Sequence, residues 1–445
     1  MSHGGDGLRR ELGLLDATMI NVGTMVASAI FIVPATIAAS MQSTGPALGI
    51  WVVAGVISLF GALCVAELGA AMPGAGGQYV YLSQAFHPVV GFLYGWSAFL
   101  VINTGTIAAI AVGFASYVGF FVPLTPAAIK AIAVASIVVL TAINCRGLQT
   151  SALVQNVFTL LKMAALLALP VLAVATGAAT AGNLAPLWPA AGDTSWLIAA
   201  GPALVAALWA FDGWIEVTYV GSEVKNPGRI LPLSIILSTV IVILLYLMAN
   251  VAYLAVLSPG VAGASTLVAS DAAQVILGAG GAAFIAGAIL LSTLGANHGM
   301  VFTSARIPYA MAREGMFFAW AGRLHPTTQS PNTVLVVQGI VAVLLTLTGS
   351  YEQLLTYVVF VGFVFYALSA LAVIRLRRLR PDLPRPYRAW GYPATPVLFI
   401  LFALYLVADT IMQAPRESAV GAGLVLLGVP AFWYWRRTAS PAAGR

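Results

Sequence analysis

Long runs of apolar residues without charge recur along this chain, and they restrict its fold more than any single motif. Of its 445 residues, 60% are hydrophobic and only 8% are charged, and the mean hydropathy is +0.96. An α-helix crosses the apolar core of a bilayer with about 20 such residues. Soluble domains of this length carry much more charge, so the composition predicts an all-α integral membrane protein.

The apolar runs predict twelve transmembrane helices. These spans cover roughly residues 14–40, 45–71, 86–120, 128–145, 151–177, 196–220, 231–257, 275–305, 332–348, 353–374, 395–413 and 418–435. The terminal segments 1–13 and 437–445 are expected in the cytoplasm. The spans divide into five within 14–177, five within 196–375 and two within 393–436.

Positive charge lies on one side of this arrangement. Of the 20 Lys and Arg residues, Lys130 and Arg416 fall in outer loops and Lys162 lies within a span, which leaves 17 in the inner segments. Such a bias predicts both termini in the cytoplasm and a multi-pass protein of the cell (inner) membrane. The same charges set topology, so the pI near 9.4 indicates the lipid bilayer and not nucleic acid as a partner.

Enzyme chemistry has little support in the sequence. There is no phosphate-binding loop, no His or Cys set with metal-ligand spacing, and no cluster of loop carboxylates. The two cysteines, Cys64 and Cys145, lie in or beside apolar runs and are expected to pack as free thiols. We expect no catalytic residue, metal or cofactor.

Asp212-Gly213 interrupts the sixth apolar run. An Asp-Gly pair favours the end of a helix, and a break inside the membrane frees backbone groups that can bind a polar solute. The alternative is that Asp212 caps a second half-helix or faces another polar group.

A cluster of small and hydroxyl residues lies in the first run, from Gly23 to Phe31. It is compatible with close helix packing or with a second break, and Gly23 is its one true helix breaker. Two interrupted helices, each opening a set of five spans, match the inverted-repeat pattern of secondary transporters.

Lys162 is the one lysine within a predicted span, and ionisable residues at such depth usually mark a site. Gln155, Thr159 and Lys162 share a helix face, and the rest of that helix is apolar, so the stripe must face the interior. Lys162 serves either as a fixed cation or as a proton carrier. Glu67 is interpreted as a structural acid near the inner interface, and His298 as a neutral packing histidine.

Four collinear segments resemble the amino acid–polyamine–organocation superfamily, in particular bacterial members of its L-amino acid transporter family. Gly23–Phe31 is similar to the family motif of span 1. The other three are AELGAAMPGAGGQYVYLSQAFHPVVGFLYGW (66–96), LWAFDGWIEVTYVGSEVKNPGRILP (208–232) and GANHGMVFTSARIPYAMAREG (295–315).

The resemblance implies a LeuT-like fold, a 5+5 inverted repeat with broken helices 1 and 6 that hold an L-amino acid between them. Backbone amides at the first break would bind the carboxylate, and carbonyls at the sixth the amino group. Lys162 matches a family lysine at the ion site of sodium-coupled relatives, which implies sodium independence, and Tyr246 a residue associated with gating. The implied substrate-binding residues are Thr24, Val26, Ala27, Ser28, Ala29, Ile30, Trp209, Ala210, Phe211 and Asp212.

Three positions depart from the family pattern. Ala27 and Ala29 replace glycines, and their methyl groups suggest a small substrate. His298 replaces an asparagine. The segment Phe121–Thr125 has no cysteine for joining the glycoprotein heavy chain of animal members, so none is expected.

The sequence therefore predicts a sodium-independent secondary transporter of small neutral L-amino acids, an exchanger working by alternating access. One alternative is a proton-coupled symporter that uses Lys162. Another is an exchanger that also takes cationic amino acids through Asp212. A channel or receptor is the alternative of a different class. The sequence does not rank alanine, serine, threonine and glycine.

Overall fold

The structure is a computed structural model that describes residues 7–348 and 351–438, the side chains of 351–359 excepted. Parts of the expected terminal segments, residues 1–6 and 439–445 with Arg445, lie outside the described residues. Within the described residues the fold is all-helical. An isolated parallel β-bridge joins Leu12 and Val224.

The helices follow one another with short connections. Those of the first half are α1 (Leu14–Met25), α2 (Ala29–Met41), α3 (Thr44–Ala71), α4 (Gln78–Ala85), α5 (Pro88–Ser97), α6 (Asn103–Val118), α7 (Pro126–Asn144), α8 (Leu148–Ala175) and α9 (Ser195–Ala210). Those of the second half are α10 (Pro227–Ala264), α11 (Val268–Leu277), α12 (Gly281–Ser304), α13 (Arg306–Arg313), α14 (Asn332–Thr348), α15 (Tyr351–Leu379), α16 (Ala394–Gln413), α17 (Pro415–Leu426) and α18 (Gly428–Thr438). A π-helical turn, η1 (Ala98–Ile102), joins α5 to α6, and the short 3₁₀ turns are η2 (Ala181–Leu184), η3 (Glu216–Thr218), η4 (Gly221–Glu223), η5 (Gly278–Gly280) and η6 (Ala319–Gly322).

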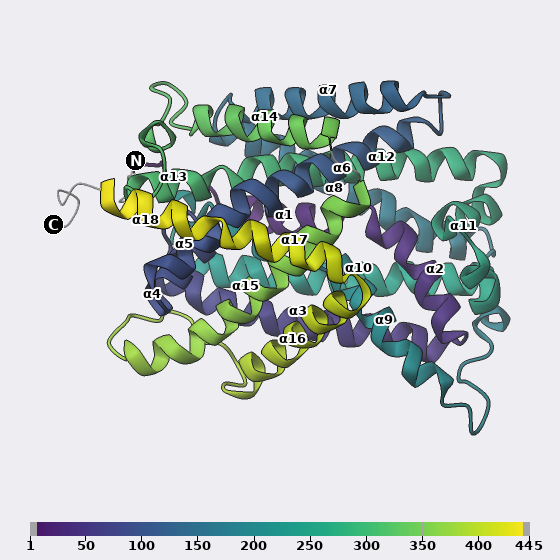
Figure 1. Ribbon diagram of the computed structural model, residues 1–445. Helices are drawn as coiled ribbons and strands as arrows, with labels where there is room; N and C mark the ends of the chain where they lie inside the picture. Colours follow the sequence, from purple (N-terminus) through teal and green to yellow (C-terminus); the bar gives the residue numbers. More distant parts are fainter. Residues whose placement is uncertain (1–6, 349–350, 439–445) are drawn as a thin grey trace.

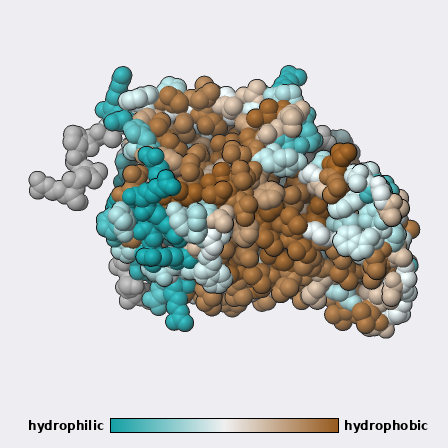
Figure 2. Space-filling view, turned by 90° about the horizontal axis from the view of Figure 1, so that it is seen from below, coloured by the Kyte–Doolittle hydropathy of each residue, from teal (hydrophilic) through white to brown (hydrophobic). Residues whose placement is uncertain are grey.

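These helices make the chain a multi-pass membrane protein. Among the described residues, 9 segments are long and apolar enough to cross a bilayer, and the bent pair α1–α2 forms a tenth. Figure 2 shows hydrophobic residues covering the middle of the molecule between more hydrophilic ends. The apolar helices α9 and α14 have 16 and 17 residues, which is below that length. The twelve-span arrangement therefore stays a prediction.

The two ends of the helical bundle differ in what they carry. One end holds the described N-terminal segment with α4 and α13, on the left of Figure 1, and is called the N-terminal face below. The opposite end holds α11 and the connection between α8 and α9, and is called the opposite face. α1 lies inside the bundle, where it packs against α8, α10 and α12.

The first apolar run is broken between α1 and α2, which are bent by 48°. α1 continues through Gly23 and ends at Met25, so Gly23 is not the helix breaker that its sequence context suggests. Its role is close packing, because an added Cβ would lie 2.0 Å from Nε2 of Gln155 on α8. The break itself comprises Val26, Ala27 and Ser28.

α9 ends at Ala210, directly before Phe211-Asp212-Gly213. Gly213 has φ +117°, a conformation that favours glycine, and an added Cβ would lie 3.0 Å from the backbone nitrogen of Met25. The sequence predicts a span to about residue 220 with a second half-helix, and the structure corrects this detail. Only the short turns η3 and η4 follow before α10 begins at Pro227.

A buried ion pair closes the bundle near the N-terminal face. Arg306 on α13 donates from Nε and from a terminal nitrogen to the two carboxylate oxygens of Glu223, both at 2.9 Å. Each side chain is 1% exposed. The Glu223 carbonyl also accepts from the backbone N–H groups of Glu11 and Leu12. Removing one partner of such a pair typically costs about 3–5 kcal/mol, because the other charge stays buried and unpaired.

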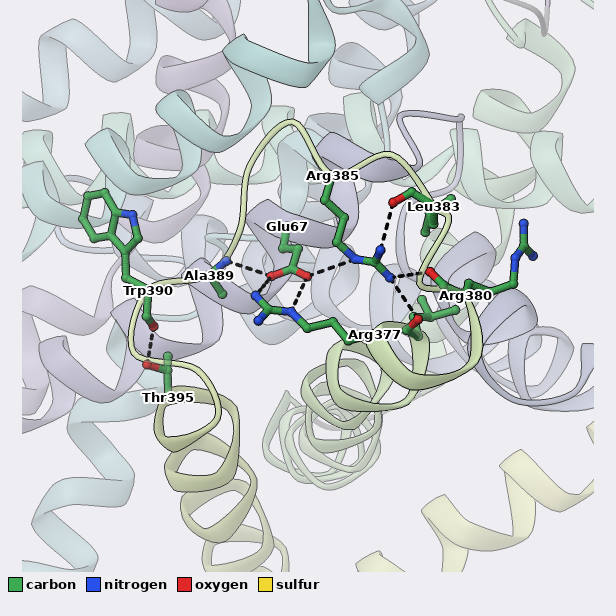
Figure 3. Close-up of polar contacts among 9 residues, drawn as sticks. Glu67, Arg377, Arg380, Leu383, Arg385, Ala389, Trp390 and Thr395 are labelled. Atoms are coloured by element: carbon green, nitrogen blue, oxygen red, sulfur yellow. Dashed lines mark hydrogen bonds and ion pairs between the residues drawn. The ribbon is translucent and has the colours of Figure 1, made fainter.

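Glu67, near the end of α3, anchors the connection between α15 and α16 at this face (Figure 3). Its carboxylate accepts from Nε of Arg377 at 2.9 Å and from the backbone N–H of Ala389 at 2.7 Å. Arg385 approaches it at 3.5 Å. These contacts agree with its interpretation as a structural acid.

Candidate functional site

A cavity of about 110 Å³ lies between the two helix breaks, bounded also by α6, α12 and α15. A water molecule needs only about 10–15 Å³ of such space, so the cavity has room for several waters or one small solute. Most of the residues that we predicted for substrate binding line it: Thr24, Ala27, Ser28, Ala29, Trp209, Ala210 and Asp212. Val26, Ile30 and Phe211 are fully buried and do not line it.

Opposite ends of two helices meet at this cavity. α2 begins at Ala29, and its first backbone N–H groups have no intrahelical partner and no side-chain cap from Ser28. α9 ends at Ala210, so its carbonyl end points to the same space. Because a helix carries partial positive charge at its N-terminus and negative charge at its C-terminus, the cavity presents both signs. This arrangement suits a small zwitterion.

Lys162 stabilises the unwound backbone of the first break. Its ammonium donates to the carbonyl oxygens of Gly23 at 2.6 Å, Val26 at 2.8 Å and Ser292 at 3.1 Å. All three of its donors are therefore used, and the side chain is 1% exposed. Lys162 does not line the cavity. It lies behind the break and not in the solute space.

The rest of the predicted α8 stripe also faces α1. Thr159 donates to the Met19 carbonyl at 3.1 Å. Gln155 accepts or donates at Nδ1 of His298 at 3.0 Å, which fixes His298 as a buried part of the α8–α12 contact. His298 does not line the cavity, in agreement with its interpretation as a packing residue.

Tyr246 on α10 connects the two breaks. Its hydroxyl lies 2.9 Å from the carbonyl oxygen of Met25 and 3.1 Å from that of Ala210, the last residues of α1 and α9. Its ring packs against Phe211 and Trp51, with centroids 5.0 Å and 5.6 Å away. Tyr246 therefore contacts the backbone at the end of both helices, and its role in gating stays a prediction.

Two further residues that the sequence did not single out hold the breaks. The Ser292 hydroxyl on α12 lies 2.9 Å from the Val26 carbonyl oxygen. Asn21 on α1 donates to the Trp214 carbonyl at 2.8 Å and accepts from the Val217 N–H at 2.9 Å. Asn21 thus supplies hydrogen bonds to backbone groups after α9 that a continued helix would have satisfied itself. Both are polar residues in apolar helices, and that is their only signal in the sequence.

Asp212 lies at the wall of the cavity, partly exposed to it. Its Oδ1 accepts from the Tyr366 hydroxyl at 2.7 Å and from the Gly213 N–H at 2.9 Å. These two donors support an ionised carboxylate. None of the four ion pairs among the described residues includes Asp212.

The fold and this cavity define a class of protein, the multi-pass membrane transporters that bind a solute where helices are interrupted. The sequence profile of the amino acid permease family matches residues 12–429. The chain belongs to this family, in the amino acid–polyamine–organocation superfamily, as the four motifs indicated. Membership of this family supports amino acid transport as the activity of this protein.

Relatives in the L-amino acid transporter family cover nearly the whole chain. This chain is 31% identical over 436 residues to the b(0,+)-type amino acid transporter 1 of Mus musculus. The alignment covers 96% of this chain and 88% of the mouse protein. This chain is also 32% identical over 448 residues to the large neutral amino acids transporter small subunit 2 of Rattus norvegicus. That alignment covers 97% of this chain and 82% of the rat protein.

Lys162→Ala is expected to leave the protein folded and to abolish most of its transport. The substitution removes the ammonium from the carbonyls of Gly23 and Val26 at the break and of Ser292 on α12. A buried acceptor left without a donor costs about 1–3 kcal/mol. We therefore expect labelled amino acid uptake in proteoliposomes to fall at least about tenfold. Lys130→Ala is the matched control, because Lys130 only bonds the Leu347 carbonyl away from the cavity. Wild-type uptake by Lys162→Ala would contradict this role.

Proposed function

We propose that this protein is a sodium-independent exchanger of small neutral L-amino acids that works by alternating access. One observation carries the proposal: the N-terminus of α2 and the carbonyl end of α9 face the same cavity. An amino acid's carboxylate is matched by the amide end and its ammonium by the carbonyl end. The b(0,+)-type and large neutral relatives, named as amino acid transporters, support the substrate class.

The LeuT-like architecture is part of this proposal. Residues 14–177 form the first repeat, 196–375 the second, and 393–436 the last two helices. The interrupted runs α1–α2 and α9 open the two repeats and meet through Asn21, Thr24 and Tyr246. Such paired breaks are the usual binding site of inverted-repeat transporters.

The position of Lys162 supports the proposed sodium independence. Unwound carbonyls inside the membrane attract a cation, and here the lysine ammonium occupies the carbonyls of Gly23, Val26 and Ser292. A resident cation leaves no need for a sodium ion. Its three hydrogen bonds also favour the fixed-cation role over the proton-carrier role.

A preference for small side chains follows from Ala27 and Ala29. Both line the cavity, so their methyl groups occupy space that glycine would leave open. Asp212 favours a second candidate, because its carboxylate at the cavity wall suits the ammonium or guanidinium of a cationic amino acid. A substrate panel that includes arginine separates the two.

Alternating access requires that the cavity be closed to one side of the membrane at a time. Toward the N-terminal face the cavity ends at Tyr219, whose hydroxyl lies 2.7 Å from that of Tyr94. Ile110 and Gly113 line it along α6, toward the opposite face. The pairs of Arg306 with Glu223 and of Arg377 with Glu67 reinforce the closed side. We assign the N-terminal face to the cytoplasm on the positive charge of its loops.

We also propose that the transporter acts without a heavy chain. Some relatives are named as small subunits, but the connection 121–125 of this chain has no cysteine. Of its two cysteines, Cys64 is buried and Cys145 follows α7 at its other end.

Exchange is tested with purified protein in proteoliposomes. We expect labelled alanine or serine to enter only vesicles preloaded with unlabelled amino acid, without sodium, because the empty carrier does not return. The panel also contains glycine, threonine and arginine. Uptake into empty vesicles driven by a pH gradient alone would contradict exchange, and saturable countertransport would exclude a channel.

Ala27→Gly and Ala29→Gly are expected to broaden the range of substrate sizes. Each removes one methyl group from the cavity wall, and one methylene in such a pocket is worth about 1–3 kcal/mol. Inhibition of alanine exchange by leucine should therefore strengthen by about tenfold or more. Ala39→Gly, in the same helix α2 but away from the cavity lining, is the matched control. Unchanged selectivity in both cavity variants would count against a size filter at these positions.

A further inference from the structure

Glu216 is a second carboxyl group at the cavity, four residues beyond Asp212. It belongs to η3, in the segment that replaces a helix after α9. The side chain is 4% exposed and lines the end of the cavity toward the N-terminal face, with Tyr219. In the sequence it is an ionisable residue within the predicted span 196–220. The contacts with substrate groups described above do not use it.

The surroundings of Glu216 do not compensate a negative charge. None of the four ion pairs among the described residues involves it. Arg306 is committed to Glu223, and Lys162 to the carbonyls of the first break. An ionised carboxylate buried without a cation is very costly, and such groups take up a proton instead.

The hydrogen bonds of Thr303 also indicate that Glu216 carries a proton. The Thr303 hydroxyl on α12 lies within hydrogen-bond distance of Oε2 of Glu216 and, at 3.0 Å, of the Gly299 carbonyl oxygen. A hydroxyl has one proton and cannot satisfy both acceptors fully. Both bonds form when the Glu216 carboxyl donates to the Thr303 oxygen and the Thr303 hydroxyl donates to Gly299.

Asp212 also lacks an ion pair among the described residues, but it differs from Glu216 in its exposure and in its hydrogen bonds. It is partly exposed to the cavity, and two donors bond its Oδ1, the Tyr366 hydroxyl and the Gly213 N–H. Asp212 is thus the ionised carboxylate and Glu216 the neutral one.

Polar groups from several elements surround Glu216. On the α1 side the polar residues are Asn21 and Thr24, which do not titrate, and His298 of α12 bonds Gln155 instead. The titratable groups that act on it are Asp212 and Tyr219 of its own segment, Tyr94 of α5 and Tyr366 of α15.

We infer that Glu216 is a proton-binding site that closes the cavity toward the N-terminal face when it carries its proton. Protonated, it bonds Thr303 and holds the segment after α9 against α12. When the O–H bond breaks, the proton passes to a water molecule in the cavity, and the remaining carboxylate must be hydrated. Hydration keeps the segment apart from α12 and prevents that face from closing. The neutral carboxyl, in contrast, can break and remake its bond to Thr303 in each cycle.

The effect of Glu216 on the transport cycle rests on the proposed function, whereas its protonation does not. In exchange, each amino acid crosses with the proton on Glu216, so inward and outward steps cancel and no net proton moves. The exchange rate still depends on pH, because a carrier without this proton cannot close. The proton itself is measured without any transport.

Infrared spectroscopy of the purified full-length protein tests the protonation directly. We expect the carbonyl stretch of a protonated carboxylic acid near neutral pH, and its loss in Glu216→Gln. Asp212→Asn is the matched control and should keep the band, because Asp212 is ionised. A band that persists in Glu216→Gln, or that disappears in Asp212→Asn, overturns the assignment, whether or not the protein transports amino acids.

The pH dependence of exchange tests the coupling. Labelled alanine exchange is measured with equal pH on both sides, from about pH 5 to about pH 9, a range above the ordinary pKa of a carboxyl group, about 4. The wild-type rate should fall with rising pH, by up to about tenfold per unit for one proton. Glu216→Gln, which mimics the neutral acid, should stay at the acid plateau. An identical fall in Glu216→Gln overturns the coupling; an inactive Glu216→Gln that keeps its native elution profile overturns it as well.

Discussion

The Lys162 ammonium, held by three backbone carbonyls of α1 and α12, is the interaction on which the rest of this structure depends. A helix that unwinds inside a membrane exposes backbone groups that no water can satisfy, and each costs several kcal/mol if left unpaired. Lys162 and Ser292 satisfy the first break, and Asn21 and Tyr246 the second. With these groups satisfied, the two breaks can be stable.

The breaks explain how an apolar bundle recognises a charged solute. Because α2 starts and α9 stops at one cavity, fixed backbone dipoles of both signs face a space of about 110 Å³. Full ionic side chains are almost absent from this space. Asp212 contributes a carboxylate at the wall, and Glu216 a neutral acid at the closed end. In the proposed function, specificity for the backbone of an amino acid comes from the helix ends, and selection by size from the methyl groups of Ala27 and Ala29.

Much of the fold could be predicted from the apolar runs. The predicted start of span 1 at residue 14 and end of span 2 at residue 71 coincide with α1 and α3, because long runs are bounded by polar or helix-breaking residues. Asp212-Gly213 predicts the end of α9 to within two residues. The prediction that Gly23 breaks the helix is wrong. A glycine needed for close packing against Gln155 cannot be distinguished from a helix breaker by sequence alone. The absence of a helix after Gly213 depends on Asn21, nearly 200 residues away, and no local pattern encodes it.

The site was partly predictable for the same reason. Lys162 stands out because a charged residue in an apolar helix must have partners, although the sequence does not name the three carbonyls. Seven of the ten predicted binding residues line the cavity, whereas Val26, Ile30 and Phe211 are buried in the packing around the breaks. Ser292 and Asn21 carry no motif, since serine and asparagine occur widely in membrane helices. Their roles follow only from their place beside the breaks.

The central claim is that helix ends at one cavity recognise both charged groups of an amino acid. It is tested most directly by competition against labelled L-alanine exchange in proteoliposomes. The competitors are L-alanine, L-alaninamide without the carboxylate, and propionate without the ammonium. A charge-assisted hydrogen bond is worth about 1.5–3 kcal/mol, so we predict each truncated analogue to inhibit at least about tenfold more weakly than L-alanine. Equal inhibition by either analogue would contradict recognition by paired helix ends.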